Sequence, residues 1–256
     1  MAGGTRTTRK PELRAPTPLR VSDPGVGSHV IRRHAEREGY VFCRGLVPRD
    51  RIDALRAHAL AVAENLGWLD PDAPTGAALA SAGVRLGAYD DPRWIEFLEI
   101  VLTHSTFAAV RTAPPVMALL TAILGAPPEP DAGDLCRVVS RDDPTHTTVA
   151  HQDRFYLPDG APRWSMWVPL GSCPLALGPL AVLPRSHARG LLPHAGETAW
   201  RRGVDVADDA DWAASHLEPG DAIFFGWLTV HRALPNVSGR ALRLSATYRY
   251  RAASLE

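Results

Sequence analysis

The segment Thr147–Leu157, with the sequence TTVAHQDRFYL, decides how the fold of this chain is interpreted. Its composition predicts a strand over residues 147–156. Side chains two positions apart in a strand point to the same side, so we expect His151 and Asp153 to share a face. Two imidazoles and one carboxylate, facing open positions, are the ligand set of mononuclear non-haem iron(II) oxygenases. The segment therefore predicts two such ligands, and an adjacent strand must supply the third.

Context separates His151 from the other histidines that precede an acidic residue by two positions. With ten histidines and 28 acidic residues, chance alone gives about one such tripeptide, and the sequence holds three. His34 lies in a predicted helix, where residues i and i+2 point in different directions. His216 precedes a turn at Pro219-Gly220. We therefore expect His34 and His216 to bind no metal.

The two halves of the chain differ in periodicity. Apolar spacing and helix-starting prolines predict helices over residues 26–38, from 48 towards 68, from 92 beyond 102 and over 115–124, with a strand at 40–43. Later, short apolar runs between turn residues predict strands at 135–140, 147–156, 163–170, 180–183, 221–225 and 242–250. This order predicts helices followed by an antiparallel sandwich or barrel, an α+β arrangement.

The length and the termini predict one domain. The chain has 256 residues, of which 45% are hydrophobic, enough for a single core. The basic N-terminus lacks the apolar stretch of a secretory signal, so residues 1–25 are expected to form a disordered tail. Residues 26–256 form the predicted domain, with a core at about 130–251. The stretch at about 190–220 is expected to be an insertion that caps a pocket.

Charge, hydropathy and cysteine content exclude several classes of protein. Basic and acidic residues both number 28, which gives no support for a nucleic-acid partner. No apolar run approaches the roughly 20 residues that span a bilayer. Cys43, Cys136 and Cys173 are too few and too widely spaced for a disulfide framework or a cysteine zinc site. We expect three buried thiols, a cytoplasmic protein, and a monomer or homodimer that acts on a small molecule.

An ordered set of motifs resembles the phytanoyl-CoA dioxygenase family of iron(II)- and 2-oxoglutarate-dependent oxygenases. The motifs are HQD at 151–153, WVPL at 167–170, GPLAVLPRSH at 178–187, Gly220-Asp221, His231 and Asn236. The resemblance covers roughly residues 28–250. It implies a double-stranded β-helix (a jelly-roll, cupin-like core) with flanking N-terminal helices. It also implies iron(II), O2 and 2-oxoglutarate, with His151, Asp153 and His231 as catalytic metal ligands.

The distal carboxylate of 2-oxoglutarate requires a cation, and the forked guanidinium of arginine suits it. Two candidates follow His231. Arg240 belongs to a predicted turn, whereas Arg243 lies in a predicted strand with Ser245 on the same face. The resemblance favours Arg243 with Ser245, but the spacing from His231 is one residue longer than the family pattern. Arg240 therefore stays open as the alternative.

Further contacts and departures follow from the resemblance. Thr148 and Trp167 match positions that contact 2-oxoglutarate or line the pocket in relatives, although ordinary strand packing explains both equally well. Ala233 stands where the family often has a small hydroxyl residue. Arg185 interrupts the usual Pro-Gly-Ser-His signature, and its side chain faces either solvent or the pocket.

Asp153 narrows the expected reaction. Related halogenases carry a small residue at this carboxylate position, so the resemblance implies hydroxylation of an unactivated C–H bond, rather than halogenation, in bacterial natural-product biosynthesis. Desaturation, epimerisation and cyclisation remain alternatives with the same ligands. A non-catalytic jelly-roll module with a relic metal site is an alternative of another class.

The substrate pocket is expected to lie between three segments. These are residues 70–92, residues 154–156 and the insertion at about 190–220. Arg154, Arg163, Arg185 and Trp227 are candidate substrate contacts, although surface or packing roles explain each of them as well.

Overall fold

The computed structural model describes residues 15–84, 86–157, 160–196, 201–207 and 209–253. Its helices are α1 (Ser28–Glu38), α2 (Arg49–Asn65), α3 (Pro92–Thr103), α4 (Ser105–Arg111), α5 (Pro114–Leu124) and α6 (Asp153–Tyr156), with short 3-10 turns at Thr75–Ala77, Leu175–Leu177 and Ser186–Arg189. Its strands are β1 (Tyr40–Cys43), β2 (Pro128–Pro130), β3 (Leu135–Val139), β4 (Arg163–Pro169), β5 (Leu180–Val182), β6 (Ala222–Gly226), β7 (His231–Ala233) and β8 (Arg243–Ala252).

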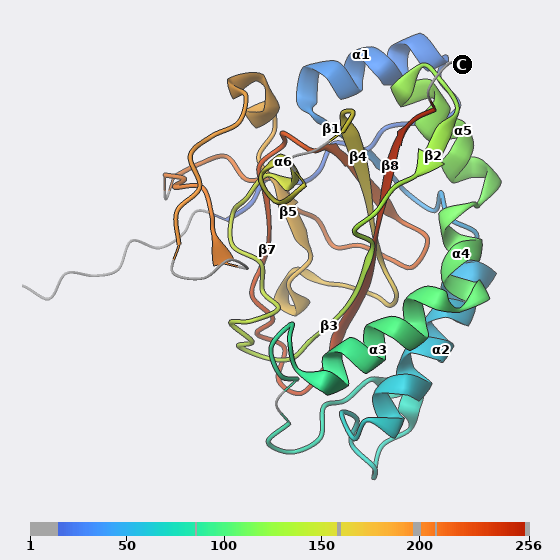
Figure 1. The fold of residues 1–256 in the computed structure, drawn as a ribbon, viewed down its shortest axis with the longest axis vertical. Helices are drawn as coiled ribbons and strands as arrows, with labels where there is room; N and C mark the ends of the chain where they lie inside the picture. Colours follow the sequence, from blue (N-terminus) through green and yellow to red (C-terminus); the bar gives the residue numbers. More distant parts are fainter. Residues whose placement is uncertain (1–14, 85, 158–159, 197–200, 208, 254–256) are drawn as a thin grey trace, which may run out of the picture.

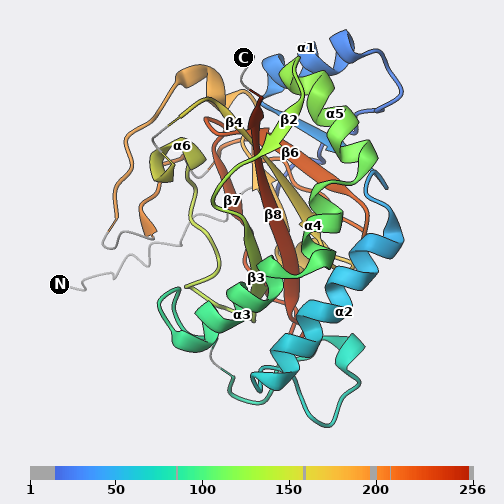
Figure 2. The same ribbon diagram turned by 45° about the vertical axis from the view of Figure 1, so that its right-hand side comes forward.

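Two antiparallel sheets form the core. The larger has the order β1-β6-β4-β8-β2, with β3 also paired to β8, and the smaller consists of β5 and β7. Helices α2 to α5 lie along one side of the large sheet, and β5 and β7 lie on its other side (Figures 1 and 2). This arrangement confirms the predicted α+β class and the jelly-roll core with flanking helices.

The alternation along β8 determines what each face of the large sheet does. Its even-numbered residues pack into the core shared with the helices: Leu244, Ala246, Tyr248 and Tyr250. Its odd-numbered residues are polar, are also buried, and alternate with them: Arg243, Ser245, Thr247 and Arg249. Because successive side chains of a strand point to opposite faces, β8 presents a row of polar groups to the space between the sheets.

The neighbouring strands follow the same rule. Met166 of β4 and Phe224 of β6 belong to the helix-side core. Trp167 of β4 and Phe225 of β6 belong to a second core, which also includes Val182 of the small sheet. The large sheet is therefore buried on both faces, and the polar row of β8 lies between two packed layers.

The helix boundaries agree closely with the turn signals in the sequence. Helix α3 begins at Pro92, and the side chain of Asp91 accepts a hydrogen bond from the Arg93 amide. Helix α1 ends at Glu38, and the residue that follows, Gly39, has a φ of 78°. A Cβ atom there would lie 2.4 Å from Nδ1 of His187, so both the backbone and the packing require glycine.

The predicted strand over residues 147–156 is wrong. Only His151 pairs like a strand residue, through an isolated antiparallel bridge to His231. Asp153–Tyr156 then forms the single helical turn α6. Gln152, which is extended and precedes this turn, donates from its side-chain amide to the carbonyls of Gly190 and Leu228. Tertiary hydrogen bonds therefore override the local strand preference.

Other boundaries also differ from the prediction. Within the predicted tail, residues 1–14 lie outside the described residues, whereas residues 15–25 pack on the domain. Leu19 is buried, and Thr17 and Val21 form bridges to Ala213 and Phe42. The core also extends beyond 130–251, because β1 is an edge strand of the large sheet. Helix α4 and strand β7 were not predicted.

The segment at 190–220 is mostly irregular where it is described. Ala213 bridges to Val182 and Leu217 bridges to Cys173, so its second half lies beside the sheets. All three cysteines are free and buried, as predicted. Among the described residues no single helix meets the length and hydropathy needed to span a membrane, although the bent pair α4 and α5 meets them jointly.

Candidate metal centre and adjoining cavities

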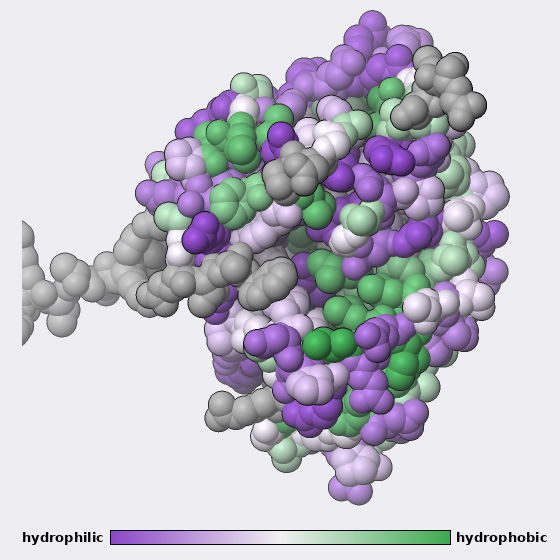
Figure 3. All heavy atoms as spheres, in the orientation of Figure 1, coloured by the Kyte–Doolittle hydropathy of each residue, from purple (hydrophilic) through white to green (hydrophobic). Residues whose placement is uncertain are grey.

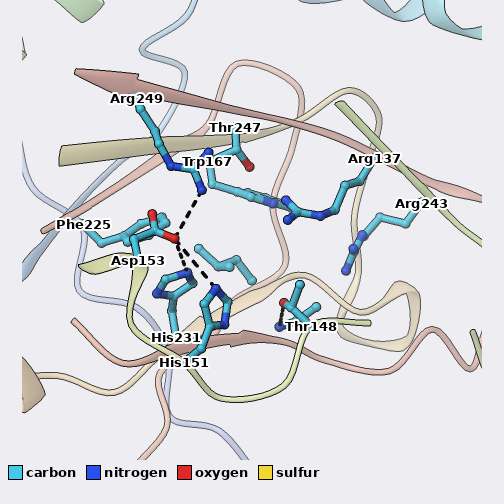
Figure 4. Close-up of a pocket in the computed structure, with 12 residues that line it drawn as sticks. Arg137, Thr148, His151, Asp153, Trp167, Phe225, His231, Arg243, Thr247 and Arg249 are labelled. Atoms are coloured by element: carbon cyan, nitrogen blue, oxygen red, sulfur yellow. Dashed lines mark hydrogen bonds and ion pairs between the residues drawn. The ribbon is translucent and has the colours of Figure 1, made fainter. Parts of the chain in front are cut away.

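His151, Asp153 and His231 come together between the two sheets. One potential ligand atom from each lies within 4.8 Å of the others, and all three side chains are buried. Oδ1 of Asp153 is 3.8 Å from Nε2 of His151 and 3.7 Å from Nε2 of His231. The mutual His151–His231 bridge sets the two imidazoles side by side, and α6 turns Asp153 back towards them (Figure 4).

Both imidazoles are held with Nε2 towards the centre. Nδ1 of His151 lies 2.8 Å from the carbonyl of Val149, and Nδ1 of His231 lies 2.9 Å from the carbonyl of Thr229. A carbonyl only accepts, so each Nδ1 carries the proton and each Nε2 presents a lone pair. Burial, followed by the nearby His231, lowers the pKa of His151 to about 3, and burial also lowers that of His231. Both rings are therefore neutral at ordinary pH.

The carboxylate of Asp153 has a partner at each oxygen. Ser165 of β4 donates to Oδ2 at 2.6 Å, and Arg249 of β8 donates to Oδ1 at 3.2 Å. Burial by itself would raise the pKa of Asp153, but Arg249, the two imidazoles and Ser165 lower it overall. Asp153 is therefore ionised and fixed in orientation.

This donor set fits a divalent transition metal. Two neutral imidazole nitrogens and one carboxylate oxygen face a common point, and hydrogen bonds outside the set fix all three groups. The donors resemble the two-histidine, one-carboxylate set of non-haem iron(II) oxygenases.

A narrow cavity extends from the triad along the polar row of β8. Arg243 lines it and is only 2% exposed. Its Nη1 donates to the Gly178 carbonyl, whereas its Nε has no hydrogen-bond partner among the described residues. Burial lowers the pKa of Arg243 to about 10, so it remains a cation at neutral pH.

Arg240, the alternative to Arg243, lies elsewhere. Its guanidinium binds the carboxylate of Asp70 and the carbonyl of Ala80 on an exposed turn. Arg240 does not belong to the residues lining the narrow cavity. The structure therefore brings Arg243, and not Arg240, into the cavity that contains the triad.

The remaining residues predicted to contact 2-oxoglutarate are Thr148, Trp167 and Ser245. Thr148 and Trp167 both line the narrow cavity. Oγ1 of Thr148 accepts a hydrogen bond from the backbone amide of Ala233. Ala233 is the position at which the family often has a hydroxyl residue. Ser245 is buried beside Arg243, and its hydroxyl has no partner in the described part of the chain. Its side chain lies outside the set that lines the cavity.

A larger cavity of about 360 Å³ adjoins the narrow one. The two share Arg137, Thr148, His151, Asp153 and Arg249 as lining residues. Its remaining walls are mainly apolar or aromatic: Tyr89, Leu98, Gly133, Leu135, Val149, Tyr156 and Leu157. Hydrophobic residues gather beside α3, the helix that carries Leu98, on the face shown in Figure 3. The triad therefore lies where a polar and an apolar cavity meet.

The predicted pocket walls are partly wrong. Tyr89 and Tyr156 come from two of the predicted segments, but no described residue of 190–220 lines either cavity. Of the candidate contacts, Arg154 lies over the Trp227 ring and Arg163 pairs with Asp131 at 2.5 Å. Arg185 is exposed. These side chains pack or face solvent rather than line the cavities.

Four polar residues of this site were given no role on the basis of the sequence. Thr247 and Arg249 share the strand phase of Arg243, so the alternation along β8 was the available signal. Arg137 lies opposite Ser245 in the β3–β8 pairing, and Ser165 lies opposite Arg249 in the β4–β8 pairing. These two depend on strand register, which no local pattern shows.

The sequence model of the family described as phytanoyl-CoA dioxygenase matches residues 35–244. A 1-deoxypentalenic acid 11-beta-hydroxylase from Streptomyces arenae is 26% identical over 242 residues, covering 88% of this chain and 81% of the relative.

The solved structures that share the fold include two enzymes from nogalamycin biosynthesis. The epimerase SnoN from nogalamycin biosynthesis, in complex with Fe3+, alpha ketoglutarate and nogalamycin RO, superposes with a TM-score of 0.62 at 20% identity, covering 90% of this chain and 85% of SnoN. The non-heme alpha ketoglutarate dependent carbocyclase SnoK superposes with a TM-score of 0.61 at 20% identity, covering 92% and 88%.

Proposed function

The chain belongs to the phytanoyl-CoA dioxygenase family, and from this premise we propose that it is an iron(II)- and 2-oxoglutarate-dependent dioxygenase. We propose that it hydroxylates an unactivated C–H bond of a small molecule in natural-product biosynthesis. A relative that covers most of the chain is named as a hydroxylase of 1-deoxypentalenic acid, which supports this reaction and substrate size. We further propose that the enzyme is cytoplasmic, where its three free thiols stay reduced, and acts as a monomer or homodimer.

One observation carries the proposal. The His151–Asp153–His231 triad lies at the junction of a narrow cavity that contains a buried arginine and a larger, mainly apolar cavity. A 2-oxoglutarate oxygenase requires these three parts: a metal site with open positions, a cation for the co-substrate, and an apolar pocket for the substrate. A relic metal site would need neither of the flanking cavities.

The side chains of the site have distinct roles in this proposal. His151, Asp153 and His231 would hold iron(II), which together with 2-oxoglutarate and O2 would supply the oxidising chemistry for hydroxylation. Arg243 pairs with the distal carboxylate of 2-oxoglutarate, with Trp167 beside it. The apolar walls of the larger cavity exclude water and hold the substrate over the triad.

A spectroscopic titration tests the proposal without any knowledge of the substrate. Iron(II) added anaerobically with 2-oxoglutarate is expected to give a weak visible charge-transfer band in the wild-type protein. The His231→Ala variant, which removes one ligand, is expected to give none. A wild-type protein that binds the metal but shows no band with 2-oxoglutarate would contradict the proposal.

The outcome of the oxidation is a separate question from the cofactors. The fold is shared with an epimerase and a carbocyclase at about 20% identity, so the fold does not select hydroxylation. Mass spectrometry of the product distinguishes the outcomes. Hydroxylation adds one oxygen atom, desaturation or oxidative cyclisation removes two hydrogen atoms, and epimerisation leaves the mass unchanged. We expect the addition of oxygen.

A further inference from the structure

Arg137 lines the chamber formed by the narrow and the larger cavity, and it has no carboxylate partner among the described residues. It is half-buried on β3, and its guanidinium extends from this strand into the pocket drawn in Figure 4. Its hydrogen bond is a long one, 3.4 Å from Nε to the hydroxyl of Tyr89. No described carboxylate lies within ion-pair distance of it, whereas Arg249 has Asp153 at 3.2 Å. Arg137 therefore has hydrogen-bonding capacity that the described protein does not use.

The charged residues that line the two cavities also favour an anionic ligand. Three arginines and one aspartate line the two cavities, which leaves two excess positive charges when both histidines are neutral. Iron(II) and the dianion of 2-oxoglutarate cancel one another and leave this excess in place. A partly buried positive excess next to an apolar wall is costly unless an anion compensates it. A further anionic group would offset one of these two charges.

The position of Arg137 assigns this anion to the substrate rather than to 2-oxoglutarate. Arg243 lines only the narrow cavity, whereas Arg137 lines both cavities. Beyond the five shared residues, the larger cavity offers no other charged side chain among its described walls. A ligand that fills this cavity thus meets one unpaired cation at the Arg137 end and apolar groups such as Leu98, Leu135 and Leu157 elsewhere.

We propose that the substrate is a compact, mainly apolar carboxylic acid whose carboxylate pairs with Arg137. Its hydrocarbon body fills the larger cavity, so that C–H bonds of that body, and not the carboxylate, face the triad. This inference rests on the proposed function for the reaction, but the binding of the acid depends only on the cavity and Arg137. A cavity of about 360 Å³ suits a small fused-ring or branched skeleton better than a long chain.

A matched pair of probes with one hydrocarbon cage tests this inference. Adamantane-1-carboxylate and the neutral 1-adamantanol are titrated calorimetrically into the anaerobic protein with iron(II) and saturating 2-oxoglutarate, which occupies Arg243. A charge-assisted hydrogen bond to Arg137 predicts roughly 10- to 100-fold tighter binding of the carboxylate. Arg137→Met is expected to remove this preference and to keep the affinity for the alcohol. Arg137→Lys is expected to retain part of it.

Arg141→Met serves as the control, because Arg141 lies exposed just beyond the same strand. It is expected to leave the carboxylate preference unchanged. Equal affinity for acid and alcohol, or no binding of either, would overturn the inference. A preference that survives in Arg137→Met, with weaker 2-oxoglutarate binding, would assign Arg137 to the co-substrate instead. A preference that depends on Arg137 without any iron–2-oxoglutarate band would support this inference and overturn the proposed function alone.

Discussion

At the scale of single residues, the partners of Asp153 decide how well the site holds a metal. Ser165 donates to Oδ2, which leaves Oδ1 facing the two imidazoles. We predict that Ser165→Ala weakens iron(II) binding by roughly 10- to 100-fold, the usual effect of losing a hydrogen bond to a ligand. Competition with a coloured chelator measures the dissociation constant. Ser172→Ala is the control, because Ser172 is exposed and contacts His216 and Glu218; equal affinities in both variants would refute the prediction.

The two arginines that follow His231 give a second prediction at this scale. Arg243 is buried in the narrow cavity, whereas Arg240 pairs with Asp70 on the surface. We predict that Arg243→Gln weakens 2-oxoglutarate binding at least about 30-fold, because a buried charge pair loses its cation. Arg240→Gln is expected to change it less than about twofold. The anaerobic visible band titrated with 2-oxoglutarate gives both constants, and the reverse ranking would assign the clamp to Arg240.

At the scale of elements, local patterns predicted α1, α2, α3, α5 and β8 well, because their signals are local. Pro92 and Gly39 mark helix ends through their own backbone preferences, and the alternation of apolar residues identifies β8 as a strand. The strand prediction for the segment around His151 was wrong because the signals that shape this segment are not local. Its conformation is set by His231 and by the tertiary hydrogen bonds of Gln152, which are distant in sequence.

The helix-facing side of β8 carries a prediction about stability. The hydroxyl of Tyr248 is buried and has no partner among the residues described, whereas Tyr250 donates to the carbonyl of Arg111 at 2.9 Å. We predict that Tyr248→Phe raises the free energy of unfolding by about 1 kcal/mol, because it removes an unsatisfied polar group. Tyr250→Phe is expected to lower it by about 1 kcal/mol. Urea unfolding of the two variants compares them directly, and a loss of stability in Tyr248→Phe would show that its hydroxyl has a partner.

At the scale of the whole molecule, the site is assembled from segments that the sequence keeps far apart. The family motifs identified the triad and placed Arg243 near it, since these residues lie within one ordered set. Arg137 escaped notice because its role follows from the pairing of β3 with β8 and from the cavity that α3 closes. Residues 15–25 likewise pack through contacts with Ala213 and Phe42, which a basic, proline-containing stretch does not reveal.

Because the fold holds the three ligand side chains close together, metal binding should stabilise the whole domain. The three ligand side chains are buried and held by hydrogen bonds, and the unfolded chain offers no such arrangement. Free Mn(II), a redox-stable substitute, at about 100 times its dissociation constant adds about 2.7 kcal/mol, which raises the Tm of a domain of this size by roughly 5–10 °C. Thermal unfolding followed by circular dichroism measures the shift, and excess EDTA should reverse it. His231→Ala should unfold at the same temperature with and without Mn(II). A shift that persists in His231→Ala would place the stabilising metal outside the triad.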